Sequence, residues 1–380
     1  MKRNIPLFKV FMADSVGDKF KEVVYSGFIG EGPKVKEFEA SLTAHVGNSN
    51  ILTVNSGTSA LHLAYHMALY GGVKGYKTNP DFEIITSPIT CTATNTPIIN
   101  NGAKIVWADV DPMTGNIDPN DIRRKITKNT KAIAMIHWGG NPCDIAEINK
   151  IAKENNLLTV EDGAHSMGAA YEGRHLGNDS DFLMYSFQAI KHITSIDGGC
   201  LITKSKEHYE RAKLLRWYGI DREPKTKEAL DLRCELDVAE AGYKFHMNDV
   251  CASIGNENLK HLPWIIERHR ENAYFYNQAF AGSDKVKVAP ENPRGKSAYW
   301  LYTIHLNNRD EVMKKLAEEG INSSKVHARN DTHSMFKDFK DNNLPNAELF
   351  NNSHLCIPVG WWVSKEDREF IAEKIISFAK

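Results

Sequence analysis

Short apolar runs recur through the first 204 residues and alternate with stretches of helical periodicity. Most of these runs are apolar along their whole length, as expected of strands that are buried on both faces of a sheet. They comprise NILTV (50–54), FEIITS (82–87), AKIVWADV (103–110), KAIAMIH (131–137), LLTVED (157–162) and DFLMYSF (181–187). Helices are predicted between several of them, for example over residues 143–156. This alternation predicts an α/β fold in which a largely parallel sheet is flanked by helices.

Strand signals thin out after about residue 204, and helical patterns take their place. The later helices are predicted over 206–219, 251–280, 309–320 and 365–380, with a strand-like segment over 299–306. A chain of 380 residues exceeds the size at which one hydrophobic core stops growing, so two packed lobes are expected. We predict a large domain over residues 1–250, which includes the N-terminal segment, and a smaller C-terminal α+β domain over residues 251–380.

Composition narrows the classes of partner. The formal net charge of −1 argues against binding to nucleic acid or to a membrane surface. No 18-residue apolar run occurs and residues 1–20 contain no sustained apolar stretch, so we expect neither membrane insertion nor export. The cysteines form no Cys-x-x-Cys pair and no cluster with histidines at metal-ligand spacing. They are Cys91, Cys143, Cys200, Cys234, Cys251 and Cys356. We therefore expect a cytoplasmic protein in a reducing environment, with no metal centre.

A turn of small residues follows the first predicted strand. In NSGTSALHLA (55–64), Gly57 and Thr58 leave the strand and open a helix. The free N–H groups and positive dipole end of a helix N-terminus suit a phosphate, although simple capping by a serine or threonine explains the same residues.

Two further strands end in residues that carry chemistry. LLTVEDGAHSMG delivers Asp162 at the carboxyl edge of the sheet, where α/β folds bind ligands, although a helix-capping aspartate is the alternative. YSFQAIKHITSIDGG (185–199) places Lys191 between two apolar runs, where an ordinary surface lysine is the alternative. His192, beside it, is left unassigned.

A phosphate cup, a carboxylate and a lysine at neighbouring strand ends form the set that pyridoxal phosphate requires. The lysine holds this cofactor as a Schiff base, and the carboxylate keeps the pyridine nitrogen protonated so that the ring works as an electron sink. For the alternatives to hold, three unrelated explanations would have to coincide in one chain.

With these residues in view, the sequence resembles the DegT/StrS group of nucleotide-sugar aminotransferases, which belong to fold type I of the aspartate aminotransferase superfamily. The resemblance runs nearly end to end and rests on six ordered blocks. They are SGFIGEGPKVKEFEASLTAHVG (26–47), NSGTSALHLA (55–64), NNGAKIVWADVDPMTGNID (100–118), HWGGNPCDI (137–145), VEDGAHSMGAAYEGRHLGNDSD (160–181) and YSFQAIKHITSIDGG (185–199).

The resemblance implies a role for each matching residue. Lys191 would carry the cofactor, Ser186 would help to bind its phosphate, Asp162 would pair with the pyridine nitrogen, and His165 would contact the ring hydroxyl. It also implies a homodimer with shared active sites.

Three blocks depart from the family pattern. Cys91 stands where family members place an aromatic residue that stacks on the cofactor ring. In GYKFHMND (242–249), Lys244 and His246 replace the asparagine and the arginine of the block that reaches the phosphate in the neighbouring subunit. Lysine can still meet a phosphate, although a solvated loop lysine is the alternative. The P-x-H substrate stretch is replaced by KVHARNDTHSMF (325–336).

The reaction implied is an amino transfer in two halves. An amino acid, L-glutamate by expectation, would convert the cofactor to pyridoxamine phosphate, and a deoxy-keto-sugar on a nucleoside diphosphate would then take up the nitrogen. A pyridoxamine-dependent sugar dehydratase shares the fold, but its anchoring lysine is replaced by histidine. The other alternative is a regulatory protein that binds pyridoxal phosphate without turnover.

Overall fold

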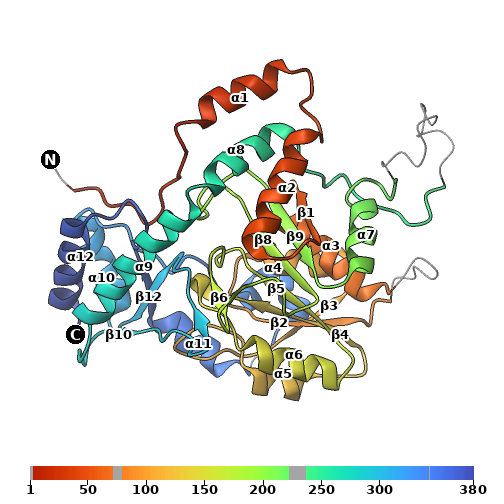
Figure 1. Cartoon of the computed structure of the whole chain (residues 1–380). Coiled ribbons are helices and arrows are strands. Elements are labelled where there is room, and N and C mark those ends of the chain that lie inside the picture. The colour runs from red at the N-terminus through yellow and green to blue at the C-terminus, as the bar shows by residue number, and fades with distance from the viewer. Residues whose placement is uncertain (1–2, 72–78, 222–236, 342) are drawn as a thin grey trace.

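The computed structural model describes residues 3–71, 79–221, 237–341 and 343–380. Its centre is a sheet of seven strands within these residues, in the order β1-β9-β8-β5-β4-β2-β3 (Figure 1). The strands are β1 (Ile51–Val54), β2 (Glu83–Thr86), β3 (Lys104–Trp107), β4 (Thr130–Ile136), β5 (Leu158–Asp162), β8 (Phe182–Ser186) and β9 (Gly199–Thr203). Within this sheet β9 pairs antiparallel with both neighbours, while the other pairs are parallel. The expected mostly parallel, mixed sheet is confirmed.

Alternate residues of each strand enter two different hydrophobic cores, because successive side chains point to opposite faces. In β8, for example, Met184 packs in one core and Leu183 in the other. The first core contains residues of α3 (Gly57–Leu69), α4 (Thr92–Asn100) and α7 (Lys206–Leu215). The second contains residues of α2 (Pro33–Val46), α5 (Pro119–Lys125), α6 (Ile145–Glu154) and α8 (Asp249–Leu259). Helices therefore cover both faces of the sheet, which explains its apolar strands.

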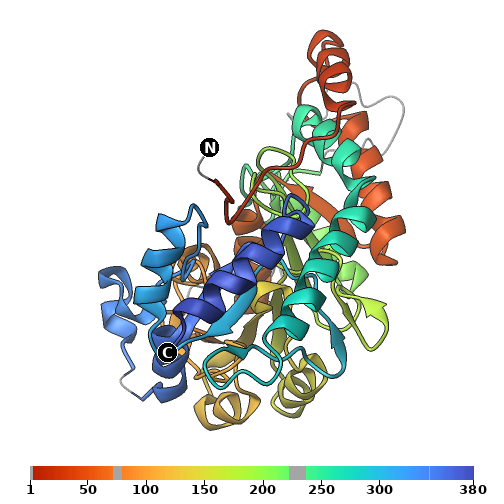
Figure 2. The same ribbon diagram turned by 90° about the vertical axis from the view of Figure 1, so that its left-hand side faces the viewer.

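A smaller antiparallel sheet, β10-β12-β13, forms a third core near the C-terminus (Figure 2). It consists of β10 (Lys287–Val288), β12 (Tyr302–His305) and β13 (His354–Ile357), packed with α10 (Arg309–Glu318) and α12 (Lys365–Phe378). Helix α9 (Leu262–Ala279) contributes to both the second and the third core. The boundary near residue 250 stays a prediction.

The remaining elements are peripheral. A third small sheet joins β11 (Gly295–Lys296), β6 (Ala170–Tyr171) and β7 (Arg174–His175), and α11 (Pro345–Ser353) lies between β12 and β13 in the sequence. Helix α1 (Val16–Tyr25) packs on α8 and projects from the body of the molecule in both views (Figures 1 and 2).

Two helices differ from the sequence-based expectation. The helix predicted over 206–219 ends at Leu215, and the one predicted over 251–280 is two helices, α8 and α9, which separate at Lys260 and His261. Pro263 lies in the first turn of α9, where its missing N–H costs no helical hydrogen bond.

None of the helices in the described ranges is both long and apolar enough to cross a membrane. Among the described residues the cysteines are free, and Cys234 lies outside the described residues.

Candidate active site

A cavity of about 360 Å³ lies at the carboxyl edge of the main sheet, between the sheet and segments of the smaller lobe. Strands β1, β2, β5 and β8 run parallel, so the segments that follow them meet at this edge. Seven of the residues predicted from the sequence line the cavity: Gly57, Thr58, Cys91, Asp162, His165, Ser186 and Lys191. The structure therefore brings together residues that are more than 130 positions apart in the chain.

Asp162 ends β5 and is held by hydrogen bonds on both carboxylate oxygens. Thr94 in α4 donates its hydroxyl to Oδ2 at 2.6 Å, and the Ala164 N–H donates to Oδ1 at 3.0 Å. The side chain is buried, with 5% of its surface exposed. These contacts fix the direction in which the carboxylate faces the cavity.

The N-terminus of α3 forms a close cradle with β8 and β9. Ser56 caps the helix by accepting the Ser59 N–H at 3.0 Å, so Gly57 and Thr58 occupy the first turn, whose N–H groups lack helical partners. A Cβ on Gly199 would lie 2.6 Å from the Gly57 nitrogen, and a Cβ on Gly57 would lie 3.1 Å from the Ser186 Cβ. Glycine at both positions lets the helix end approach Ser186.

Lys191 lies in the turn after β8, and its amine is in an environment that disfavours charge. Burial lowers the pKa of Lys191 from 10.5 to about 8, and the nearby Asp162 and Cys91 partly oppose that change. The Nζ atom lies 3.8 Å from the centroid of the Trp300 ring. An amine with this pKa is available in both protonation states near neutral pH.

His165 follows Asp162 by three positions and stacks on Trp300, with ring centroids 3.9 Å apart. Its Nδ1 is buried and finds no hydrogen-bond partner among the described residues. Burial, reinforced by Lys191, holds the pKa of His165 well below its usual value. The imidazole is therefore neutral and has one nitrogen to offer to a ligand.

Cys91 and Lys244 stand in two of the three blocks that depart from the family pattern. Cys91 is half-buried at the N-cap of α4 and lines the cavity. Lys244 is exposed and does not line this cavity; its Nζ lies over the Trp217 ring at 3.6 Å.

The cavity also contains residues to which the sequence analysis assigned no role. Thr94 stands within the TCTATN stretch after β2, and Trp300 and His327 come from the smaller lobe. His327 has a buried Nε2 with no partner among the described residues, and burial lowers its pKa to about 4. Trp300 lies at the start of the segment that was predicted to be strand-like over 299–306, and nothing in that pattern marked it as a site residue.

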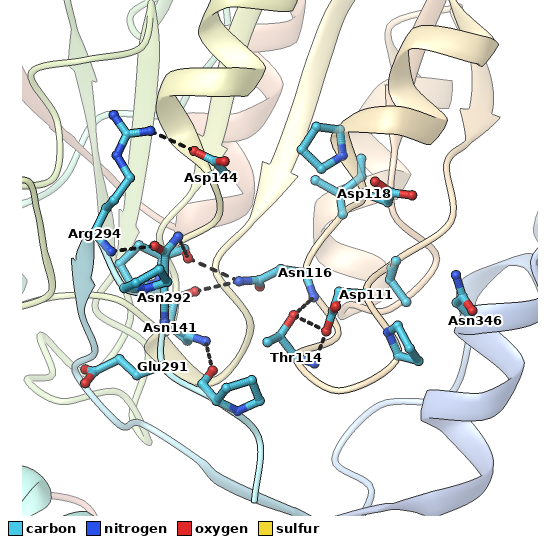
Figure 3. Close-up of a pocket in the computed structure, with 17 residues that line it drawn as sticks. Asp111, Thr114, Asn116, Asp118, Asn141, Asp144, Glu291, Asn292, Arg294 and Asn346 are labelled. Atoms are coloured by element: carbon cyan, nitrogen blue, oxygen red, sulfur yellow. Dashed lines mark hydrogen bonds and ion pairs between the residues drawn. The ribbon is translucent and has the colours of Figure 1, made fainter.

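A larger cavity, of about 520 Å³, lies elsewhere, between the loop that follows β3 and the segment before β11 (Figure 3). Asp111, Asp118, Asp144 and Glu291 line it, and Arg294 pairs with Asp144 at 3.3 Å. These carboxylates accept hydrogen bonds from their own loops or neighbours, and none of the predicted site residues lies here. We therefore assign the chemistry to the smaller cavity.

The smaller cavity fits pyridoxal phosphate. The glycine cradle offers free N–H groups to a phosphate, the unpaired Nδ1 of His165 is available to a ring hydroxyl, and Asp162 and Lys191 line the same space. A Cβ on Gly57 or Gly199 would collide with atoms of the cradle itself, so its close packing requires glycine at both positions.

Fold and cavity together define a fold-type-I aminotransferase that uses pyridoxal phosphate. The chain belongs to the DegT/DnrJ/EryC1/StrS aminotransferase family, whose model matches residues 12–376. It is thus a sugar aminotransferase.

Comparisons with known proteins agree over nearly the full chain. The sugar aminotransferase CalS13 from Micromonospora echinospora is 36% identical, with a TM-score of 0.92, and the match covers 98% of this chain and 99% of that one. The UDP-4-amino-4,6-dideoxy-N-acetyl-beta-L-altrosamine transaminase of Campylobacter jejuni is 30% identical, with 96% and 93% of the two chains covered. Spr1654 from Streptococcus pneumoniae, solved in a PMP-form and a PLP-form, is 25% identical, with TM-scores of 0.90 and 0.88. The match to its PMP-form covers 99% of each chain, and the match to its PLP-form covers 99% of this chain and 98% of that one.

Proposed function

We propose that this protein transfers an amino group from L-glutamate to the keto group of a deoxy-keto-sugar carried on a nucleoside diphosphate. The observation that carries the proposal is the single cavity in which Lys191, Asp162 and the N-terminus of α3 meet. The transaminase from Campylobacter jejuni, whose name specifies a UDP-linked amino sugar, supports the nucleotide part.

Each residue has a task that follows from its position. The N–H groups of Gly57 and Thr58 and the hydroxyl of Ser186 bind the phosphate, and His165 offers Nδ1 to the ring hydroxyl. Asp162 holds a proton on the ring nitrogen, because its two hydrogen bonds keep the carboxylate aimed into the cavity. When bound, pyridoxal phosphate supplies an aldehyde that takes up an amine and a ring that withdraws electrons from it.

Lys191 acts first as the anchor and then as the base. As a free amine, its Nζ would take the proton from the α-carbon of the amino acid in the first half-reaction and pass it to the aldehyde carbon of the cofactor. In the second, Nζ would take a proton from that same carbon and deliver it to the sugar carbon. A pKa of about 8 suits both tasks, since an amine must exchange its proton near the working pH.

A homodimer with shared sites is part of the proposal. Lys244 is exposed and does not line the cavity of its own chain, as expected of a residue that serves a neighbouring subunit. Tyr25, Phe28 and Ile29 expose 82%, 73% and 56% of their surfaces. Neighbouring exposed apolar side chains of this size support an interface with a second copy.

The free cysteines support a cytoplasmic location.

The role of Lys191 is tested by two measurements, the site of cofactor attachment and the turnover of a variant that lacks the lysine. After borohydride reduction, mass spectrometry should find the cofactor on the peptide that contains Lys191, and Lys191→Ala should bind it noncovalently and lack turnover. Lys204→Ala, at an exposed lysine outside the cavity, is the matched control and should behave as wild type. Attachment to another lysine would contradict the assignment.

Substrates are tested separately. The pyridoxamine-loaded protein should recover the aldehyde absorbance when mixed with the correct 3-keto or 4-keto nucleotide sugar, and glutamate should yield oxoglutarate. Failure with every amino donor and keto-sugar, despite a cofactor anchored on Lys191, would favour a binding protein without turnover.

A further inference from the structure

The turn that carries Lys191 is bonded on both sides to one segment of the smaller lobe. Before Lys191, the Ile190 carbonyl accepts the indole N–H of Trp300 at 2.9 Å. After it, His192 donates its Nε2–H to the Ala298 carbonyl at 3.1 Å. Lys191 therefore sits between two reciprocal hydrogen bonds that tie residues 190–192 to residues 298–300.

The Trp300 ring also receives the amine itself. The indole is buried, with 4% of its surface exposed, and the Lys191 Nζ lies 3.8 Å from its centroid. Its neighbours His165 and Phe8 stack on it at 3.9 and 4.8 Å. Packing on this scale leaves the indole little freedom to turn away from the amine.

The segment 298–300 is itself held in place. The Ala298 and Leu301 N–H groups donate to the carbonyls of Gly140 and Gly139, at 3.1 and 3.2 Å. His269 of α9 contacts the Tyr299 carbonyl at 2.8 Å. A segment fixed by the turn that follows β4 and by α9 can serve as a rigid support.

We infer that Trp300 and His192 are positioning residues for Lys191: the indole N–H and the imidazole hold the turn, and the indole ring holds the amine against the cavity wall. The inference rests on the proposed role of Lys191 as cofactor anchor. It gives His192, which the reaction does not use, a defined task.

Burial and the Trp300 ring have opposite effects on the pKa of Lys191. Burial disfavours the ammonium form, whereas an aromatic face stabilises it. The other titratable groups that face the amine are Asp162, Cys91, His165, His327 and His192. Burial holds the pKa of each of these histidines below its usual value, so their rings are neutral. The face of the Trp300 ring, by contrast, attracts the ammonium form of Lys191.

The first experiment titrates Lys191 in the cofactor-free protein, by competitive acetylation at a series of pH values with peptide mass spectrometry. Trp300→Leu should lower the midpoint of Lys191 labelling by about 0.4–1.5 pH units, the range expected for loss of a cation–π contact. Trp361→Leu is the matched control, because that indole lies under the Lys9 amine at 5.2 Å and outside the cavity; it should leave the Lys191 midpoint unchanged. An unchanged or raised midpoint in Trp300→Leu overturns the role of the ring.

The second experiment tests whether the two hydrogen bonds position residues 190–192. It measures the rate at which pyridoxal phosphate attaches to the cofactor-free protein. Trp300→Phe keeps a ring but loses the N–H, and His192→Leu loses the other donor, so both should slow attachment by about tenfold through misplacement of the amine. His192→Gln retains an N–H donor and should recover most of that rate. Attachment at the wild-type rate in both Trp300→Phe and His192→Leu overturns the inference, even if Trp300→Leu does not fold.

The two experiments separate this inference from the proposed function. If borohydride places the cofactor on another lysine while the labelling midpoint of Lys191 still moves in Trp300→Leu, the anchor assignment fails and the contact between ring and amine stands. If the cofactor is on Lys191 and neither measurement moves, the positioning role fails and the proposed function stands.

Discussion

Lys191 loses its proton more readily than a solvated lysine, because burial lowers its pKa to about 8. Only the neutral amine attacks an aldehyde, so the attachment of pyridoxal phosphate to the cofactor-free protein should depend on pH. The rate should fall about tenfold per pH unit below 8 and level off above it, whereas a solvated lysine would show this limit near 10.4. Stopped-flow absorbance measures the profile.

Asp162 offers an internal check on that profile. Its charge raises the pKa of Lys191, so Asp162→Asn should move the midpoint to lower pH. A midpoint that stays in place or rises would mean that the two groups do not interact.

Asp162 should matter far more for turnover than for cofactor binding. The phosphate cradle is a separate set of residues and survives in Asp162→Ala, whereas the proton on the ring nitrogen loses its partner. We expect turnover to fall by at least about a hundredfold, with cofactor affinity changed much less. Steady-state kinetics and a cofactor titration provide the comparison, and near-normal turnover would contradict the role.

Thr94→Val is a milder change at the same site, for comparison with Asp162→Ala. It removes the donor to Asp162 Oδ2 but keeps the carboxylate, so its loss of turnover should be smaller than that of Asp162→Ala. An equal loss would point to Thr94 as a cofactor ligand in its own right.

At the residue scale, the sequence predicted the members of the cavity that lie in recognisable blocks, and their chemical roles stay predictions. Trp300 was not predicted because its place depends on how the smaller lobe docks on the sheet edge, which no local pattern encodes. His327 lies in the KVHARNDTHSMF stretch, which was noted only as a departure from the family pattern, and its place in the cavity depends on the same docking. Thr94 escaped because its partner, Asp162, is 68 positions away.

At the element scale, the approach of α3 to β9 depends on Gly199, whose added Cβ would meet the Gly57 backbone at 2.6 Å. Gly199→Ala should push the helix N-terminus away from Ser186. We expect a loss of about 1–3 kcal/mol in the free energy of unfolding and about tenfold weaker cofactor binding. Thermal unfolding and a fluorescence titration measure the two effects.

Gly17→Ala is the matched control. Gly17 lies within α1, and a Cβ added there would meet no heavy atom within 4 Å, so alanine should be neutral or should stabilise by about 0.5–1 kcal/mol. A Gly199→Ala protein as stable as Gly17→Ala would show that the cradle tolerates a wider spacing.

The strands of the main sheet were predicted from their apolar runs, because burial on both faces leaves a strong composition signal. Their order and the antiparallel sense of β9 were not, since pairing joins segments far apart in the chain. The break between α8 and α9 was missed for a local reason. Pro263 stands at a helix start, where it is tolerated, but the apolar periodicity continues through it.

At the scale of the whole molecule, shared sites make a quantitative prediction. If Lys244 serves the cavity of a second copy, Lys191→Ala and Lys244→Ala chains should complement each other when mixed and reassociated. Random pairing makes half of the dimers mixed, each with one intact site, so roughly a quarter of all sites should regain activity. Activity is measured against the fraction of heterodimer from native mass spectrometry.

The complementation requires Lys244→Ala to be impaired by itself. Recovery no greater than the weighted sum of the two parents, in a sample that contains heterodimers, would remove Lys244 from the partner's site. The dimer itself is then judged by its measured mass.

The bonds around Lys191 link residues 106 and 110 positions apart, Ala298 with His192 and Trp300 with Ile190. Closing such long loops is costly in chain entropy, so contacts of this kind tend to form late during folding. A cofactor that needs the finished cavity would then stabilise the native state without stabilising the folding transition state. Pyridoxal phosphate should accordingly slow unfolding and leave the refolding rate unchanged, so that it protects the finished enzyme but gives no help to a nascent chain.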